Sequence, residues 1–141
     1  MKILHLSNTA GKLGGGVAQV VQSIFSHQLK KGFSSFLWFI GKKKEKIELS
    51  EELNVDKANI SVIKFFFGIR YLFYPSFFIK AFIKKYNYNI IHQHGVFLPT
   101  SVFSLIKSYT NSKILISPHG FLEPEKMRVS TLKKKNSSLF V

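Results

Sequence analysis

The feature that most constrains the fold is an alternation of short apolar runs with segments of helical periodicity. The apolar runs have the length and composition of buried strands, and they occupy residues 2–7, 34–40, 60–65, 89–93 and 113–117. Strands that alternate with helices form βαβ units, which assemble into a parallel sheet covered on both faces. The sequence therefore predicts an α/β fold with a parallel sheet and helices on both of its faces.

The segments between these runs predict the helices. Apolar residues recur at helical spacing from Val17 to Leu29, and basic residues followed by Gly32 predict the end of that helix. Residues 66–86 predict a helical segment with a break at Pro75, and residues 98–109 predict a further helix. The polar residues 42–59 predict an exposed excursion.

The length and the absence of cysteine limit the classes of protein. A chain of 141 residues corresponds to about one domain, and its 45% hydrophobic residues are enough for a core. Without cysteine, neither a disulfide framework nor a thiolate metal site can form. We expect a cytoplasmic protein, with peripheral attachment to the inner face of the cell membrane left open.

The formal net charge of +14 raises the question of an anionic partner. Arg70 and Arg128 are the only arginines, and arginine is the residue best suited to bidentate recognition of phosphates and bases. The lysine excess therefore argues against specific nucleic-acid binding, while a basic and aromatic surface suits an anionic membrane. The apolar residues 65–86 are interrupted by Arg70, Pro75 and Lys80, so they do not predict a membrane span.

Glycine and histidine follow the ends of several predicted strands. A glycine-rich turn occupies residues 8–16, His94-Gly95 ends the fourth apolar run, and His119-Gly120 follows the fifth. The carboxyl ends of parallel strands meet at one edge of the sheet, where α/β proteins bind their ligands. We therefore expect one site assembled from several loops.

The glycines at positions 14–16 lead directly into the first predicted helix. Glycine lets a backbone approach a ligand closely, and amides at a helix N-terminus suit phosphate. The loop matches neither the P-loop nor the dinucleotide-binding pattern, and Gly41-Lys42 stands where a ribose-binding acid would be expected. A plain structural turn remains the alternative.

The histidines offer a second kind of site. His92 and His94 share one face of a strand and, with His119, could in principle make a three-histidine zinc site. No acid or cysteine accompanies them, so we favour histidines that form hydrogen bonds in a cleft and expect no metal. His5 and His27 are interpreted as structural, and Glu123 with Glu125 as either a glycosidic carboxylate pair or a solvated loop.

Three segments, taken in order, resemble the N-terminal, acceptor-side domain of family 4 retaining GT-B glycosyltransferases. They read "MKILHLSN…GGGVAQVV", "YNIIHQHGVFLPTSV" and "KILISPHGFLEP". The resemblance covers Met1 to about Lys135, and the last two segments resemble a subgroup that acts in the biosynthesis of surface polysaccharides. It implies a Rossmann-like parallel sheet, the incomplete N-terminal half of a GT-B fold.

The resemblance also implies roles for particular residues. Gly14, Gly15 and Gly16 would pack against the diphosphate of a nucleotide-sugar donor. His119 would be the catalytic residue at the donor sugar, donating a hydrogen bond to a sugar hydroxyl or a phosphate oxygen. The remaining cleft residues, toward the acceptor side, would be His94, Gly95, Gly120 and Glu123. No cofactor or metal is implied, and the acceptor would be a saccharide or a lipid-linked saccharide.

A GT-B enzyme has a second domain that binds the nucleotide-sugar, and the motifs of that domain do not occur in residues 1–141. We therefore expect an N-terminal fragment that is inactive by itself. One alternative is a half-enzyme that works with a separate donor-domain chain. The other is a basic module that binds nucleic acid or a membrane surface.

Overall fold

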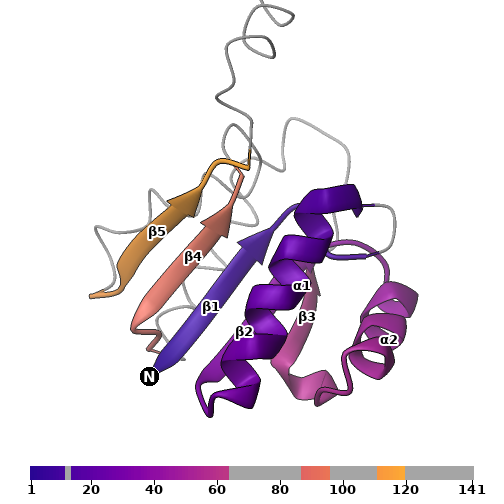
Figure 1. The fold of residues 1–141 in the computed structure, drawn as a ribbon, viewed down its shortest axis with the longest axis horizontal. Helices are drawn as coiled ribbons and strands as arrows, with labels where there is room; N and C mark the ends of the chain where they lie inside the picture. The colour runs from indigo at the N-terminus through magenta and orange to yellow at the C-terminus, as the bar shows by residue number, and fades with distance from the viewer. Residues whose placement is uncertain (12–13, 64–86, 96–110, 120–141) are drawn as a thin grey trace, which may run out of the picture.

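The sheet is parallel throughout (Figure 1). The computed structural model describes residues 1–11, 14–63, 87–95 and 111–119. The described strands are β1 (Lys2–Ser7), β2 (Ser34–Ile40), β3 (Ile60–Ile63), β4 (Ile90–His94) and β5 (Lys113–Ser117). All five lie where the apolar runs predicted them, so the α/β, Rossmann-like sheet is confirmed.

The strand order is β3-β2-β1-β4-β5. The chain thus adds two strands on one side of β1 and then crosses over to add two on the other side. This order is that of a doubly wound sheet, and its direction of winding reverses between β1 and β4. Such a reversal opens a crevice beyond the carboxyl ends of the two strands, which is where ligands bind in this architecture.

Both described helices pack on one face of the sheet. Helix α1 (Gly15–Lys30) buries Ala18, Val21 and Phe25, which recur at helical spacing and form its inward face. Val21 and Phe25 share one apolar cluster with Leu49 of helix α2 and with residues of β2 and β3. The helices predicted at 66–86 and 98–109 lie outside the described residues.

The exposed excursion predicted at 42–59 contains helices that the sequence did not predict. Helix α2 (Lys43–Glu52) forms there, followed by the short helix η2 (Lys57–Asn59). Leu49 is buried, but most of the helix is charged, so its apolar face is too narrow to give a periodic signal. The Glu45 carboxylate accepts a hydrogen bond from the Lys42 backbone amide, an N-terminal cap that the charged composition concealed.

The two faces of β1 have different neighbours. Leu4 and Leu6 belong to an apolar cluster with Trp38, Tyr88 and Ile91. His5 points to the opposite face, toward α1, because successive side chains of a strand alternate.

Among the described residues, no helix is long and apolar enough to cross a membrane.

Candidate functional site

The carboxyl ends of three adjacent strands bring the predicted histidines together. Ser7 of β1 pairs with His94 of β4, and His94 pairs with Ser117 of β5. Gly95 continues from β4 with a φ of 96°, and its amide donates to the carbonyl oxygen of Ser117 at 2.7 Å. This bond joins the two strand-end loops, so the loop of His94 and the loop of His119 leave the sheet side by side.

His94 and His119 are in direct contact. His94 Nδ1 lies 2.9 Å from His119 Nε2, a hydrogen-bond distance. His94 is fully buried, whereas His119 is half-buried at the end of the strand. The structure thus places one histidine inside the molecule and the other at the edge of the sheet where this topology binds its ligands.

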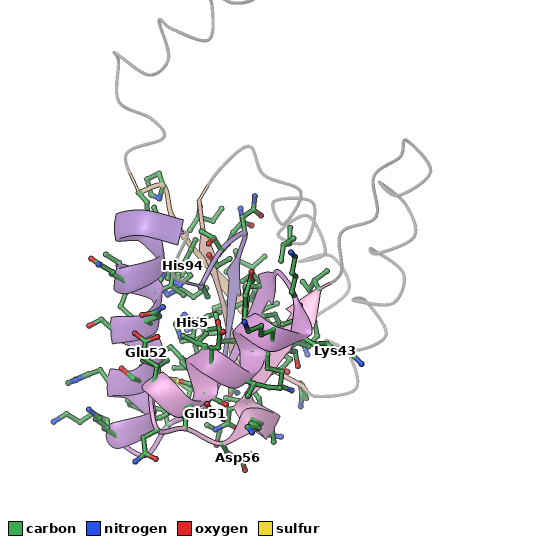
Figure 2. All side chains as sticks on the ribbon, turned by 90° about the vertical axis from the view of Figure 1, so that its right-hand side faces the viewer. His5, Lys43, Glu51, Glu52, Asp56 and His94 are labelled. Atoms are coloured by element: carbon green, nitrogen blue, oxygen red, sulfur yellow. The ribbon has the colours of Figure 1, made fainter. Side chains whose placement is uncertain are left out.

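The contact continues inward to a histidine that the sequence had indicated only as structural. His94 Nε2 lies 2.9 Å from His5 Nδ1, and His5 Nε2 lies 2.8 Å from Gln28 Oε1 on α1. Figure 2 shows His5 and His94 beside α1, on the face that the helix covers. We call these four residues the histidine row: Gln28, His5, His94 and His119. The row runs from α1 through the interior to the strand ends.

Sequence reasoning missed Gln28, although a signal for it exists. Gln28 follows Val21 and Phe25 at helical spacing, so the periodicity places it on the buried face of α1. A polar side chain on a buried face needs a partner. Gln28 Oε1 has two, His5 and the hydroxyl of Ser35, which donates to it at 2.7 Å.

His92 lies beside the histidine row but not in it. Its ring centroid is 4.0 Å from that of His94, and its Nε2 lies 2.8 Å from the hydroxyl of Ser117. His5, His92 and His94 each offer a nitrogen within 4.8 Å of the others, which is the donor set of a three-histidine metal site. The hydrogen bond between His5 and His94 occupies two of those nitrogens, so this arrangement fits hydrogen-bonded histidines.

The histidines of the site are held in their neutral form. Burial lowers the pKa of His5, and burial likewise lowers the pKa of His119. The pKa of His92 is lowered to about 4, first by burial and then by its neighbours His5 and His119. The pKa of His94 is lowered further, by burial and by the three histidines around it. At neutral pH the site therefore presents uncharged imidazoles.

The backbone at His119 is unusual for a residue with a side chain. Its φ is 48°, in the left-handed region that residues other than glycine seldom adopt. Such conformations persist where the surrounding structure holds them, and they concentrate at functional sites. Here the bond to His94 is one contact that holds the side chain in place.

The predicted diphosphate-binding glycines lie at the start of α1. A side chain at Gly14 would collide with Thr9 and with Ala18, so this position requires glycine. Gly15 has a φ of 58°, and among the described residues no atom lies within 4 Å of a Cβ added at Gly15 or at Gly16. The backbone of these two residues is therefore open to the approach of a ligand. The predicted cleft residues Gly120 and Glu123 lie outside the described residues.

Comparison with known proteins gives one informative likeness. No protein-family model and no curated protein matches the chain. A crystal structure of a glycosyltransferase from Rickettsia africae ESF-5 does match, with a TM-score of 0.59 and 16% sequence identity, over 85% of this chain and 32% of that one. The chain thus spans about a third of the length of that glycosyltransferase. At this identity the likeness establishes a glycosyltransferase-like fold.

Proposed function

We propose that this chain is the acceptor-side, N-terminal part of a retaining glycosyltransferase of family 4. It would serve the transfer of a sugar from a nucleotide-sugar donor to a saccharide or lipid-linked acceptor in surface-polysaccharide synthesis. The observation that carries the proposal is the meeting of His94, Gly95 and His119 beyond the strand reversal of a glycosyltransferase-like sheet. Fold alone does not specify an activity, so the argument rests on the chemistry of this edge.

That chemistry suits an uncharged, hydroxyl-rich ligand. The side chains at the described strand ends are neutral imidazoles and hydroxyls, which form hydrogen bonds without imposing a charge. Such groups can hold and orient a sugar ring next to the reacting bond, which is the contribution expected of His119. The glycine loop supplies the complementary part, because the open backbone at Gly15 and Gly16 lets a diphosphate approach the amides of α1.

The remaining parts of the proposal follow from the family resemblance. The nucleotide would be held by a second domain, supplied by a longer chain or by a partner chain, and no metal or cofactor would be needed. The chain by itself would then bind saccharide weakly and transfer no sugar. The surplus of positive charge would place it at the anionic inner face of the cell membrane, where lipid-linked acceptors lie.

Saturation-transfer NMR on the chain tests the proposed ligand class. Methyl hexosides and nucleotide-hexoses are titrated into wild-type protein and into His119→Ala. We expect millimolar binding of a saccharide and at least a tenfold loss in the variant, because the histidine at the crevice is removed. His27→Ala is the matched control, since His27 is exposed on α1. Absence of saturation transfer to every saccharide tested would contradict the proposal.

The net charge of +14 favours one rival, a module that binds nucleic acid. Electrostatic binding to RNA or DNA falls steeply as salt rises, because it depends on the release of counterions. We expect any shift of a random oligonucleotide to disappear at physiological ionic strength. Binding that persists there, together with no saccharide binding, would support the rival. Flotation with anionic vesicles tests the membrane part separately.

A further inference from the structure

The histidine row connects the half-buried Gln28 of α1 to His119, which is half-buried just beyond the end of β5. We propose that Gln28, His5 and His94 are positioning residues that fix the tautomer of His119. In this tautomer His119 carries its hydrogen on Nε2, toward the interior, and keeps the lone pair of Nδ1 for a ligand. The ligand group that His119 meets is then a hydroxyl, which donates a hydrogen bond to it.

Gln28 sets the direction in which hydrogen bonds are donated along the histidine row. Its Oε1 lies 2.8 Å from His5 Nε2, and a carbonyl oxygen can only accept. His5 Nε2 therefore carries a hydrogen. A neutral imidazole has a single N–H, so His5 Nδ1 must be an acceptor. The hydroxyl of Ser35 donates a second hydrogen bond to the same oxygen at 2.7 Å.

The same reasoning assigns the donor and the acceptor in the next two hydrogen bonds of the row. Since His5 Nδ1 accepts, His94 Nε2 must donate across the 2.9 Å between them. His94 Nδ1 is then the acceptor, and His119 Nε2 must donate across the next 2.9 Å. All three histidines thus carry the hydrogen on Nε2, and each bond determines the next one.

The ring geometry and the burial of the histidines support this direction of hydrogen-bond donation. The ring planes of His5 and His94 differ by 24° and those of His94 and His119 by 17°, so each N–H lies close to the plane of the ring that accepts it. The lowered pKa values keep all three rings neutral, which the argument requires. His5 and His94 are fully buried, so water does not compete for their nitrogens.

The consequence for the ligand rests on the proposed function. The family resemblance implied that His119 donates a hydrogen bond to a sugar hydroxyl or to a phosphate oxygen. The row assigns the opposite sense, because the outward nitrogen has no hydrogen to donate. An oxygen of the diphosphate in a nucleotide-sugar, which carries no hydrogen at neutral pH, is a poor partner for that lone pair. A saccharide hydroxyl, which can donate, is a good one.

Nitrogen NMR of the histidine rings tests the tautomer without any ligand. Long-range proton–nitrogen spectra of the ¹⁵N-labelled chain at pH 7.5 distinguish hydrogen on Nδ1 from hydrogen on Nε2, and single His→Gln variants assign the signals. We expect the Nε2–H form at His5, His94 and His119. Hydrogen on Nδ1 of His119 would overturn the proposal.

Substitutions at Gln28 test whether the histidine row fixes the tautomer of His119. Gln28→Glu keeps an acceptor at the same place, so we expect His119 to keep its tautomer. Gln28→Leu removes the acceptor, so we expect the His119 nitrogen shifts to move toward the average of the two tautomers. His92→Gln is the matched control, a buried histidine against His94 but outside the row, and it should leave His119 in the Nε2–H form. Unchanged His119 shifts in folded Gln28→Leu would overturn the proposal, and Gln28→Glu remains informative if Gln28→Leu does not fold.

A ligand titration separates this proposal from the proposed function. Methyl hexoside and sulfate, an oxyanion that carries no hydrogen at pH 7.5, are added to wild type, Gln28→Glu and Gln28→Leu. We expect hexoside to shift the His119 signals in the first two, with about tenfold weaker binding in Gln28→Leu, and sulfate to leave His119 unshifted. The expected tautomer without hexoside binding would contradict the proposed function alone. Sulfate binding at His119 Nδ1 in the wild type would contradict the ligand assignment made here.

Discussion

The face of the sheet beneath α1 has two halves of different chemistry. Over β2 and β3 it is apolar, and we call this the apolar half: Leu37, Phe39 and Ile60 of the strands, with Val21 and Phe25 of α1 and Leu49 of α2. Over β1 and β4 it is polar, and we call this the histidine half: His5, His92 and His94, with Gln28 of α1 and Ser117 of β5. The three histidines of the strands are as buried as the strand residues of the apolar half, so exposure does not explain the difference.

The two halves are stabilised by different interactions. Apolar side chains contribute by leaving water and need only to fill the space, so they tolerate exchanges of similar volume. Buried imidazoles contribute little unless every nitrogen finds a partner, and leaving one unpaired is costly. A site that needs a defined tautomer is a reason to keep histidines where leucines would pack. The apolar half therefore holds the fold, and the histidine half prepares the site.

The largest expected effect is in the apolar half. Phe25 is fully buried, and its ring also meets the edge of His5, with 6.2 Å between ring centroids. Phe25→Ala should lower the free energy of unfolding by about 3–5 kcal/mol, because it removes buried area and leaves a cavity. Urea unfolding followed by circular dichroism measures this change.

Phe33→Ala is the control for this substitution. Phe33 is 39% exposed, so the same change there should alter stability by only about 0.5 kcal/mol. Equal effects at the two positions would show that the apolar half is not the core of the fold.

A double-mutant cycle in the histidine half gives the next largest effect. His5→Leu and His94→Leu each leave the other histidine with an unpaired nitrogen, which should cost about 1–3 kcal/mol per variant. Replacing both removes the two nitrogens of their shared bond together and leaves only Gln28 and His119 without their partners in the row, so the double variant should lose less than the sum of the two. Urea unfolding of the four proteins measures the coupling between the residues.

His27→Leu provides the reference for the cycle. His27 is exposed on α1, so its replacement should not couple to His94→Leu. Strictly additive losses for His5 and His94 would mean that their contact contributes nothing, and the histidine half would then resemble the apolar half.

The sequence predicted the sheet well because the signal for each strand is local. Each of the five apolar runs is short, and each became a strand. Helix α2 was missed because its buried contact rests on Leu49 within a largely charged segment. Local patterning thus sufficed where the apolar residues dominate and failed where a single residue makes the contact.

The candidate site was predicted only in part, because it depends on strand order. The histidine pattern predicted that His92 and His94 share a face, and that His94 and His119 leave the sheet at one edge. No local pattern shows that β1 lies next to β4, so His5 was interpreted as structural without its bond to His94. Gln28 was missed for the same reason, since its partners come from β1 and β2.

The smallest expected effect is a difference in acid sensitivity, and it bears on the histidine half alone. The pKa of His92 is lowered to about 4 in the folded chain, chiefly by burial, against an ordinary value of 6.5. Above pH 6.5 neither the folded nor the unfolded state binds a proton at this ring, so His92 has no effect on stability there. Below that pH the unfolded chain binds the proton and the folded chain does not. The free energy of unfolding therefore falls, by up to about 1.4 kcal/mol per pH unit for one histidine, until the pH nears 4.

Glutamine does not titrate, so His92→Gln should be less acid-sensitive than the wild type. Between pH 7.5 and 5.5, urea unfolding should show a loss that is about 1 kcal/mol smaller in the variant. His27→Gln should follow the wild type, because His27 is exposed on α1 and lies outside the histidine half. If His92→Gln and the wild type lose stability in parallel, His92 is protonated in the folded state. The environment of His92 would then be more polar than its burial implies. The contrast between the two halves would rest on His5 and His94 alone.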